Sequence, residues 1–258
     1  FLIENMEITG NSPSGIYVEQ GTSGTIQYCD IHNNGGAGSA GPGAGIRVHG
    51  SNNNSCNVNI LHNSIYSNQA VMSSGGCYYG GAGGGISIEN SSAQVSHNLI
   101  YSNVGNNGGG VNINSNQQAL FHNNTITLNH AINSDCLPPS SQQWGSGKGG
   151  GYFLDGAGSN LTIKNEIIYN NTSVFTYGGG NPSNGMAYGS GYNLMYSLTN
   201  GGFWNSNSSG TNNISENPLF VNTGSGDLSY TELGCALDLM DKDNCCCHLN
   251  EKTNIYIF

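Results

Sequence analysis

The stretch "HNLIYSNVGNNGGGVNIN" at residues 97–114 decides how the rest of this chain is interpreted, because an earlier segment repeats its parts. Residues 62–90 again contain His-Asn, then Ile-Tyr-Ser-Asn, then glycines followed by an apolar-polar-apolar triplet. Only the gap in the middle differs, since 7 positions separate Asn103 from Gly110 and 17 separate Asn68 from Gly85. A phrase that repeats around one variable interval is typical of a solenoid whose insertions leave from one corner.

The same phrase extends along most of the chain. Six copies of Ile-x-x-Asn end at Asn11, Asn34, Asn68, Asn103, Asn129 and Asn171. A glycine-led triplet follows five of them, at Gly15, Gly45, Gly85, Gly110 and Gly151, and a weaker sixth begins at Gly191. The distances from each glycine to the next Asn are 19, 23, 18, 19 and 20, whereas those from each Asn to its glycine are 4, 11, 17, 7, 22 and 20. One half of the repeat therefore has a nearly constant path length.

Period-two alternation within the phrases predicts two or three short strands per repeat. Inward residues such as Ile86, Ile88, Val95 and Ile100 would stack on their counterparts about 4.8 Å away in the next coil. We expect each recurring Asn to occupy a left-handed bend and to bond to the same amide one coil away. The asparagines five places earlier, Asn63, Asn98 and Asn124, predict a second such column. The glycine before each triplet is expected to allow a sharp entry into the strand.

Composition supports a turn-rich β-structure and excludes several classes of partner. Glycine and asparagine contribute 41 and 40 of the 258 residues, and only 8% of the chain is charged. The formal net charge of −10 disfavours nucleic acid as a partner, and no apolar run is long enough to span a bilayer. The eight cysteines show no zinc-ligand spacing. Cys56 and Cys77 could form a disulfide or remain free thiols.

The array resembles the right-handed parallel β-helix repeats of the pectate-lyase-like superfamily. Its alternation of Ile-x-x-Asn with Gly-Gly-Gly-Ile is also similar to the repeats of the polymorphic outer membrane proteins, which are surface adhesins, although Ile stands here in place of Phe. The segments "GYNLMYS" at 191–197 and "NPLFVNTGSGDLSY" at 217–230 resemble a closing module of secreted bacterial β-helix proteins. The resemblance implies a scaffold that lyases, hydrolases, epimerases and adhesins share.

The predicted fold class is therefore all-β, a single-stranded right-handed parallel β-helix of about six or more coils. The helix with its closing module is expected over residues 1–230, followed by an irregular tail over 231–258. Because the chain starts in mid-phrase at Phe1, we expect a preceding module of the same chain to cover the N-terminal end.

The variable segments are the predicted walls of a substrate groove. They cover residues 35–44, 69–84, 104–109, 130–150 and 172–190. Aromatic side chains that could stack on sugar rings lie in three of them: Tyr78, Tyr79, Trp144, Phe175 and Tyr177. Equally, these rings could simply pack the loops onto the rod.

The outer positions of the triplet strands carry the candidate catalytic residues. Arg47 and His49 are expected beside Glu19 and Glu89 on adjacent coils, and Glu89 and Asp155 two coils apart. A lyase needs a base and a cation for the substrate carboxylate, which Arg47 together with carboxylate-bound calcium could supply. A hydrolase needs two carboxylates about 5–10 Å apart, and Glu89 with Asp155 fits that range. Lys148, in the longest insertion, is a further catalytic candidate. The same residue types also occur at ordinary solvated strand ends, and the shortage of basic residues weakens the lyase hypothesis.

Two hypotheses of function remain open. In the first, a secreted or cell-surface β-helix binds a polysaccharide or cell-surface glycan in a loop-lined groove and, as an enzyme, cleaves it as a lyase or glycoside hydrolase. In the second, a non-catalytic adhesin, passenger or structural protein displays loops on the rod. Both place the protein outside the cell or at its surface, and calcium is a candidate cofactor in the lyase version.

Overall fold

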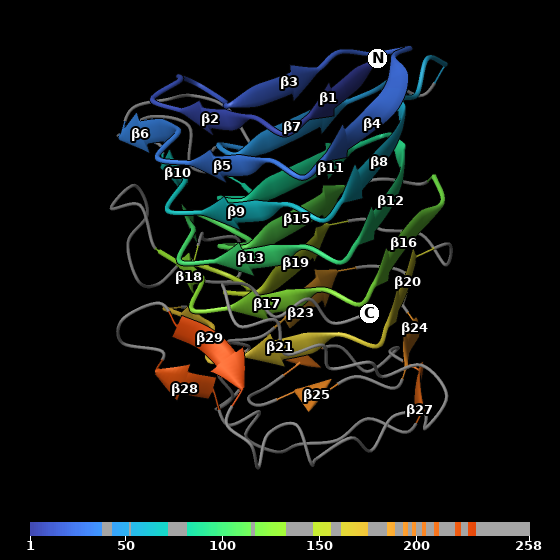
Figure 1. Cartoon of the computed structure of the whole chain (residues 1–258). Coiled ribbons are helices and arrows are strands. Elements are labelled where there is room, and N and C mark those ends of the chain that lie inside the picture. Colours follow the sequence, from blue (N-terminus) through green and yellow to red (C-terminus); the bar gives the residue numbers. More distant parts are fainter. Residues whose placement is uncertain are drawn as a thin grey trace.

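The computed structural model describes residues 1–37, 43–51, 53–71, 82–114, 117–132, 147–155 and 161–174, together with the backbone of seven short strands between 185 and 230. Every regular element in these residues is a β-strand. Almost all of the strands pair in parallel in four stacked sheets, which we name A to D. The structure is a right-handed β-helix of about five to six coils, as the repeat predicted (Figure 1).

The strands of each sheet come from successive coils. Sheet A contains β1 (Leu2–Glu4), β4 (Ser23–Gln27), β8 (Asn57–Leu61), β12 (Ser92–Ser96), β16 (Ala119–His122), β20 (Leu161–Lys164), β24 (Asn193–Met195) and β27 (Ser209–Thr211). Sheet B contains β2 (Glu7–Thr9), β5 (Asp30–His32), β9 (Ser64–Tyr66), β13 (Leu99–Tyr101), β17 (Thr125–Thr127), β21 (Ile167–Tyr169) and β25 (Leu198–Thr199).

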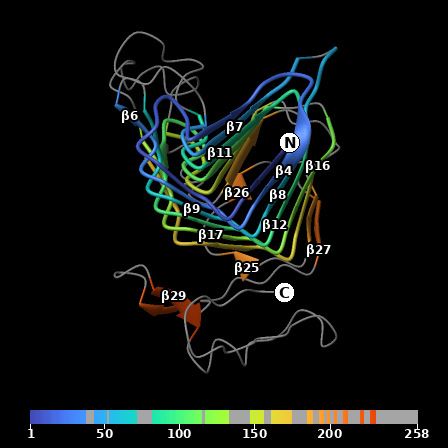
Figure 2. The ribbon, with the colours of Figure 1, turned by 45° about the horizontal axis from the view of Figure 1, so that its top comes forward.

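The variable segments begin with the strands of sheet D and lead to the strands of sheet C. Sheet D contains only short strands, β6 (Gly35–Ala37), β10 (Gln69–Val71), β14 (Val104–Gly105), β18 (His130–Ala131) and β22 (Thr172–Ser173). Sheet C contains β3 (Ile16–Val18), β7 (Ile46–His49), β11 (Ile86–Glu89), β15 (Val111–Asn114), β19 (Tyr152–Asp155), β23 (Gly185–Tyr188) and β26 (Phe203–Trp204). A complete coil runs through sheets A, B, D and C in that order, and Figure 2 shows the coils superposed.

Isoleucine side chains form continuous columns inside the helix. Ile65 pairs with Ile100, Ile100 with Ile126 and Ile126 with Ile168, all in register and all fully buried. On sheet C the column of Ile46, Ile86 and Val111 is equally buried. Each such side chain stabilises the fold by about 1.5–3 kcal/mol through its burial, so the columns supply the main driving force of stacking. The predicted interior file is confirmed.

A column of asparagines, which we name the BD ladder, lies at the corner between sheets B and D. The side-chain Nδ2 of Asn34 donates to Oδ1 of Asn68 at 3.0 Å, and the same 3.0 Å contact joins Asn68 to Asn103, Asn103 to Asn129 and Asn129 to Asn171. Successive members are 34, 35, 26 and 42 residues apart in sequence. The contact stays constant because the extra residues leave the coil elsewhere.

The backbone of the ladder corrects one expectation. The ladder asparagines do not have positive φ angles; the residue before each one does, for example Ser67 (φ 52°), Ser102 (φ 53°) and Leu128 (φ 57°). The left-handed backbone angle at this corner thus belongs to the residue before each ladder asparagine. The asparagine side chain itself points inward and bonds to the asparagines of the adjacent coils. A leucine or serine in this region is costly compared with asparagine or glycine, so stacking must hold these corners in place.

Glycine is needed at two positions before each sheet C strand, at one for a left-handed φ angle and at the other for close approach to a neighbouring coil. Left-handed φ angles occur at Gly43, Gly83, Gly108 and Gly149, three residues before the first apolar residue of each strand. The glycine directly before the strand was expected to make the sharp entry, but its role is close approach, since a Cβ on Gly85 would lie 2.7 Å from the carbonyl oxygen of Gly110. A side chain at either position is excluded for a different reason.

The C-terminal coils depart from the sequence analysis at one strand. The triplet after Gly191 was assigned to the glycine-led strand, but β24 (Asn193–Met195) belongs to sheet A and the sheet C strand of that coil is β23. The chain between Asn171 and the sheet C strand of this coil is therefore shorter than the motif match at Gly191 implied. Beyond the helix sheets, β28 (Phe220–Asn222) and β29 (Asp227–Tyr230) form an antiparallel pair within the predicted closing module.

Candidate functional site

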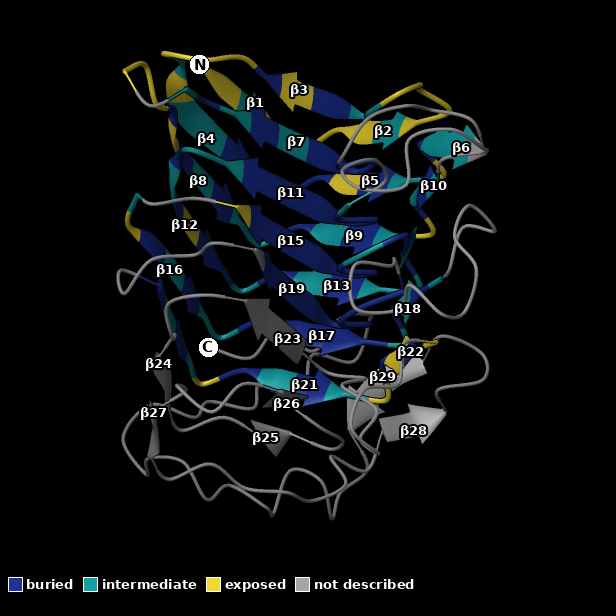
Figure 3. Cartoon of the chain, turned by 180° about the vertical axis from the view of Figure 1, so that it is seen from behind, coloured by how far each residue is buried: buried dark blue, intermediate teal, exposed yellow. Residues whose placement is uncertain are grey.

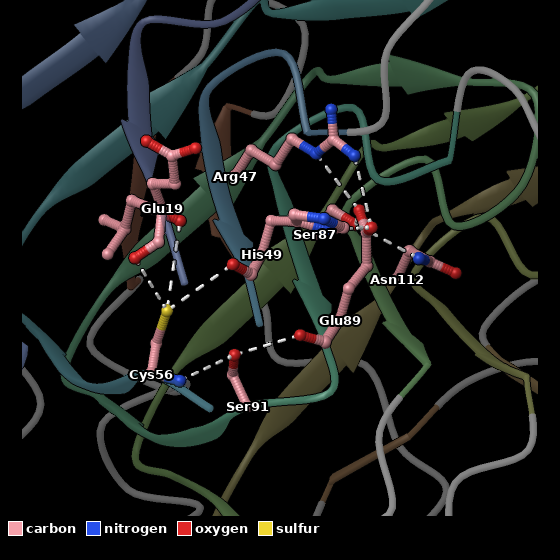
Figure 4. Close-up of polar contacts among 9 residues, drawn as sticks. Glu19, Arg47, His49, Cys56, Ser87, Glu89, Ser91 and Asn112 are labelled. Atoms are coloured by element: carbon pink, nitrogen blue, oxygen red, sulfur yellow. Dashed lines mark hydrogen bonds and ion pairs between the residues drawn. The ribbon is translucent and has the colours of Figure 1, made fainter. Parts of the chain in front are cut away.

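The candidate site lies on the outer face of sheet C, where β7 and β11 run side by side (Figure 3). Register pairs Arg47 with Ser87 and His49 with Glu89. The side chains of Arg47, His49 and Glu89 point toward one another in Figure 4. Three of the predicted site residues are therefore brought together by adjacent coils.

Glu89 is the centre of this group. Its Oε1 accepts a hydrogen bond from Nε of Arg47 at 3.2 Å and another from Oγ of Ser87 at 3.3 Å. Its Oε2 lies 3.2 Å from Nη2 of Arg47 and 2.8 Å from Nδ1 of His49. The guanidinium of Arg47 thus donates two hydrogen bonds to the carboxylate of Glu89, and such a bidentate interaction is stronger and more directional than a single hydrogen bond. Both carboxylate oxygens are occupied by protein groups.

The group continues onto neighbouring coils in both directions. Nδ2 of Asn112, on β15, donates to Oγ of Ser87 at 3.1 Å, and both of these side chains are buried. In the opposite direction, the guanidinium carbon of Arg47 lies 5.3 Å from the ring centroid of Tyr17, on β3. Such a cation–π contact adds about 0.5–1 kcal/mol at an exposed site.

Exposure decides which of these groups a partner could reach. Tyr17 is 51% exposed, and the His49 side chain is 37% exposed. The Arg47 and Glu89 side chains are 23% and 17% exposed. The accessible patch therefore consists of Tyr17, His49 and the edge of Arg47, with the Glu89 carboxylate beneath them.

The remaining predicted site residues are placed by their backbone positions. Glu19 was expected beside Arg47 and His49, and it follows Val18, which pairs with Val48. Its backbone oxygen accepts hydrogen bonds from Sγ of Cys56 and from the backbone N–H of Thr22, both at 3.2 Å. Asp155 ends β19, two strands of sheet C beyond β11, as the register predicted. Lys148 is 4% exposed, lies before β19, and donates its backbone N–H to Oδ1 of Asn107 at 3.2 Å.

The predicted aromatic sugar platform cannot be placed. Tyr78, Tyr79, Trp144, Phe175 and Tyr177 lie outside the described residues, as does Cys77. Cys56 and Cys29 are buried free thiols. Burial raises the pKa of the Cys29 thiol, so it is not activated as a nucleophile.

A charged residue that the motif analysis missed lies in the core. At the corner between sheets A and B, Cys29, Asn63, Asn98, Asn124 and Glu166 form a second column, the AB ladder. Oε1 of Glu166 accepts hydrogen bonds from Asn124, and Oε2 accepts one from the Tyr152 hydroxyl at 3.1 Å. Burial raises the pKa of Glu166 to about 8, and these hydrogen bonds offset part of the rise. The signal was present in the sequence, because Glu166 stands five places before Asn171.

The calcium of the lyase hypothesis has no counterpart in the described part of the chain. No three His, Cys, Asp or Glu side chains in those residues are grouped so that they could hold a metal ion. The carboxylate of Glu89 is instead satisfied by cationic and neutral donors. No described element is a helix long and apolar enough to cross a membrane.

Comparison with known families agrees with the architecture. Residues 1–126, which are 126 of the 258 residues, match the family model described as "Right handed beta helix region". Neither a curated protein nor a solved structure matches the chain. The match extends from the first coil into β17 and includes the Arg47–Glu89 group. The protein is thus a right-handed β-helix repeat protein by its fold. This fold does not by itself specify a function.

Proposed function

We propose that this β-helix is a glycan-binding surface protein that holds a polysaccharide on the outer face of sheet C and does not cleave it. The observation that carries the proposal is that both carboxylate oxygens of Glu89 already have hydrogen-bonding partners in the protein. A carboxylate that already accepts from Arg47, His49 and Ser87 is a poor acceptor for a substrate proton, because any proton transfer must first break these contacts.

The same group argues against a polyuronate lyase. Such an enzyme needs a cation that is free to hold the substrate carboxylate, whereas the charge of Arg47 is already matched by Glu89 at 3.2 Å. A neutral glycan makes no such demand. Tyr17 offers an exposed ring face or edge for a sugar, and His49 and Arg47 offer hydrogen-bonding edges beside it. As a glycan binder, the protein would act outside the cell or at its surface.

The test combines a binding assay with a depolymerisation assay over a panel of neutral and acidic polysaccharides, with and without calcium. We expect binding without product, and weaker binding by Tyr17→Ala and His49→Gln. Tyr66→Ala is the control, because Tyr66 is also a tyrosine at the surface but lies on β9 of sheet B, away from sheet C. Product formation by the wild-type chain that disappears in Glu89→Ala or Arg47→Ala would overturn the proposal.

One observation favours a second candidate, a glycoside hydrolase. Glu89 and Asp155 stand two strands apart on sheet C, which corresponds to about 9–10 Å between their backbones. That spacing lies near the upper end of the range for a pair of inverting carboxylates. In this case Asp155→Asn would abolish product formation and leave binding intact, an outcome that the glycan-binding proposal excludes.

A further inference from the structure

Histidine rings form a second surface feature at the corner between sheets A and B, separated from Glu89 by sheet A. His62 and His97 stack with ring centroids 4.7 Å apart and an interplanar angle of 19°. His97 meets His122 edge to face at 5.7 Å. His122 in turn pairs in register with Lys164 on the next coil. We name these four residues the histidine strip: His62, His97, His122 and Lys164.

The strip is a run of basic groups on an acidic protein. The outward residues of sheet A beside it are neutral, including Asn59, Gln94 and Leu120. Tyr28 stacks on His62 at 5.1 Å, and Asp30, at the exposed start of β5, lies two residues further along the chain. The effects that act on the three imidazoles come from burial, from each other and from Lys164, and no described carboxylate contributes. In the described residues, no carboxylate forms an ion pair with a histidine of the strip.

The same environment keeps the strip neutral until an anion is present. Burial lowers the pKa of His62 and His122, and burial together with the two neighbouring histidines lowers that of His97 to about 4. Each bound anionic group would favour the protonated imidazoles, so binding and proton uptake are linked.

The hydrogen bonds of the strip allow this change without unfolding. The ring Nε2 atoms of His97 and His122 lie 3.1 Å from Nδ2 of Asn123 and 3.3 Å from Nε2 of Gln94. A neutral imidazole accepts from these amide nitrogens. After protonation, a 180° turn of each amide would present its oxygen as the acceptor, because the two ends of an amide have nearly the same shape.

We propose that the histidine strip binds an acidic polysaccharide at mildly acidic pH, with its repeated anionic groups lying along the rod over successive coils. The occupant is a polymer because the basic groups repeat once per coil, about 4.8 Å apart, over at least three coils. A single polysaccharide chain fits one row of basic groups better than a duplex nucleic acid does, and the net charge of −10 makes binding of any polyanion depend on protonation of the strip. This surface is separate from the sheet C site and does not depend on it.

The experiment measures binding of heparin oligosaccharides and of oligogalacturonate to the whole chain at about pH 5.5 and about pH 7.5. We expect an affinity gain of about tenfold or more at the lower pH, with strong salt dependence. The triple variant His62→Gln/His97→Gln/His122→Gln should lose that gain. The matched control is His32→Gln/His130→Gln, which removes two histidines from sheets B and D and should retain it.

Each other outcome counts against the proposal. Equal affinity at both pH values, absence of binding at both, or a gain that the triple variant keeps would overturn it. Stronger binding of single-stranded DNA than of either oligosaccharide would overturn the choice of partner. Circular dichroism of each variant at both pH values shows whether a loss comes from unfolding. Failure here would leave the test on sheet C unaffected, because that test scores variants of Tyr17 and His49, which lie on a different sheet.

Discussion

The side-chain amide of Asn124 donates to the carboxylate of Glu166 over 2.6 Å inside the protein core. The corresponding contacts of the preceding coils join asparagine to asparagine at 2.9–3.0 Å. Glu166 is 1% exposed, and the Tyr152 hydroxyl also faces its carboxylate. An ionisable group thus replaces an amide within an otherwise neutral ladder.

This replacement predicts that stability falls as pH rises. The pKa of Glu166 is about 8 in the folded protein and near its ordinary value of 4.5 when unfolded. Between these values the folded state holds a proton that the unfolded state has released, so the stabilisation is complete below pH 4.5 and is lost progressively up to about pH 8. The expected loss is on the order of a few kcal/mol. Urea denaturation across this range measures it.

The control is Glu166→Gln, which keeps the shape of the side chain and replaces its titratable carboxyl group with an amide. That variant should flatten the slope, whereas Glu4→Gln, at an exposed residue bonded to Gln27, should keep it. Equal slopes in wild type and Glu166→Gln would show that Glu166 does not carry the pH dependence.

Removing one rung of the BD ladder should destabilise the fold strongly. Oδ1 of Asn103 accepts from the backbone N–H and the side chain of Asn68, and Nδ2 of Asn103 donates to the carbonyl oxygen of Ile65 at 2.9 Å. In Asn103→Ala these buried groups lose their partners, at a cost of about 3 kcal/mol or more. Asn114→Ala, at an exposed strand end, should change the free energy of unfolding by less than about 0.5 kcal/mol. Similar denaturation midpoints for the two variants would contradict a structural role for the ladder.

Two glycines that both have left-handed φ angles allow backbone strain to be distinguished from steric crowding. Gly10 (φ 72°) has open space where a Cβ would stand, whereas a Cβ on Gly108 (φ 59°) would lie 2.4 Å from the carbonyl oxygen of Val111. Gly10→Ala should cost only the left-handed penalty of about 1–2 kcal/mol. Gly108→Ala should cost that amount plus the displacement of β15, and its thermal midpoint should be clearly lower. A Gly108→Ala midpoint equal to that of Gly10→Ala would mean that the turn before sheet C relaxes freely.

The pairing of Arg47 with Glu89 should be measurable as a coupling energy. Both side chains are partly exposed, so we expect about 0.5–1 kcal/mol from a double-mutant cycle of Arg47→Met and Glu89→Gln, decreasing with added salt. A coupling near zero at low salt would indicate that solvent screens the pair. In that case Arg47 would be free to hold an anionic substrate, and the argument against a lyase would weaken.

The sequence was enough to predict the stacked columns and both ladders, because burial and amide pairing repeat at fixed offsets around Ile65, Ile100 and Ile126. It did not reveal sheet D, since strands such as β14 contain two residues and show no alternation. Glu166 was missed because the second column was defined by asparagine alone. Its offset of five residues from Asn171 nevertheless marks it as a member of the AB ladder.

The site was predictable only in part. Register alone placed His49 beside Glu89, but the two-nitrogen contact of Arg47 with Glu89 depends on side-chain conformations that no pattern encodes. The left-handed angle at Ser67 and Ser102 also contradicted the assignment to asparagine, because the local preference of a residue type yielded to the geometry of the corner.

The two ladders make the chain unequally tolerant of changes in its length. Asn98 and Asn103 are five residues apart, and Asn63 and Asn68 repeat that interval, so a single deletion between them would turn every following side chain of that strand to the opposite face. Between Asn129 and Asn171 the coil carries 42 residues where the preceding coil needs 26, and the amide contact is unchanged. Evolution, or an engineer grafting a foreign peptide, can therefore edit one edge of the rod freely while the opposite edge allows almost no change.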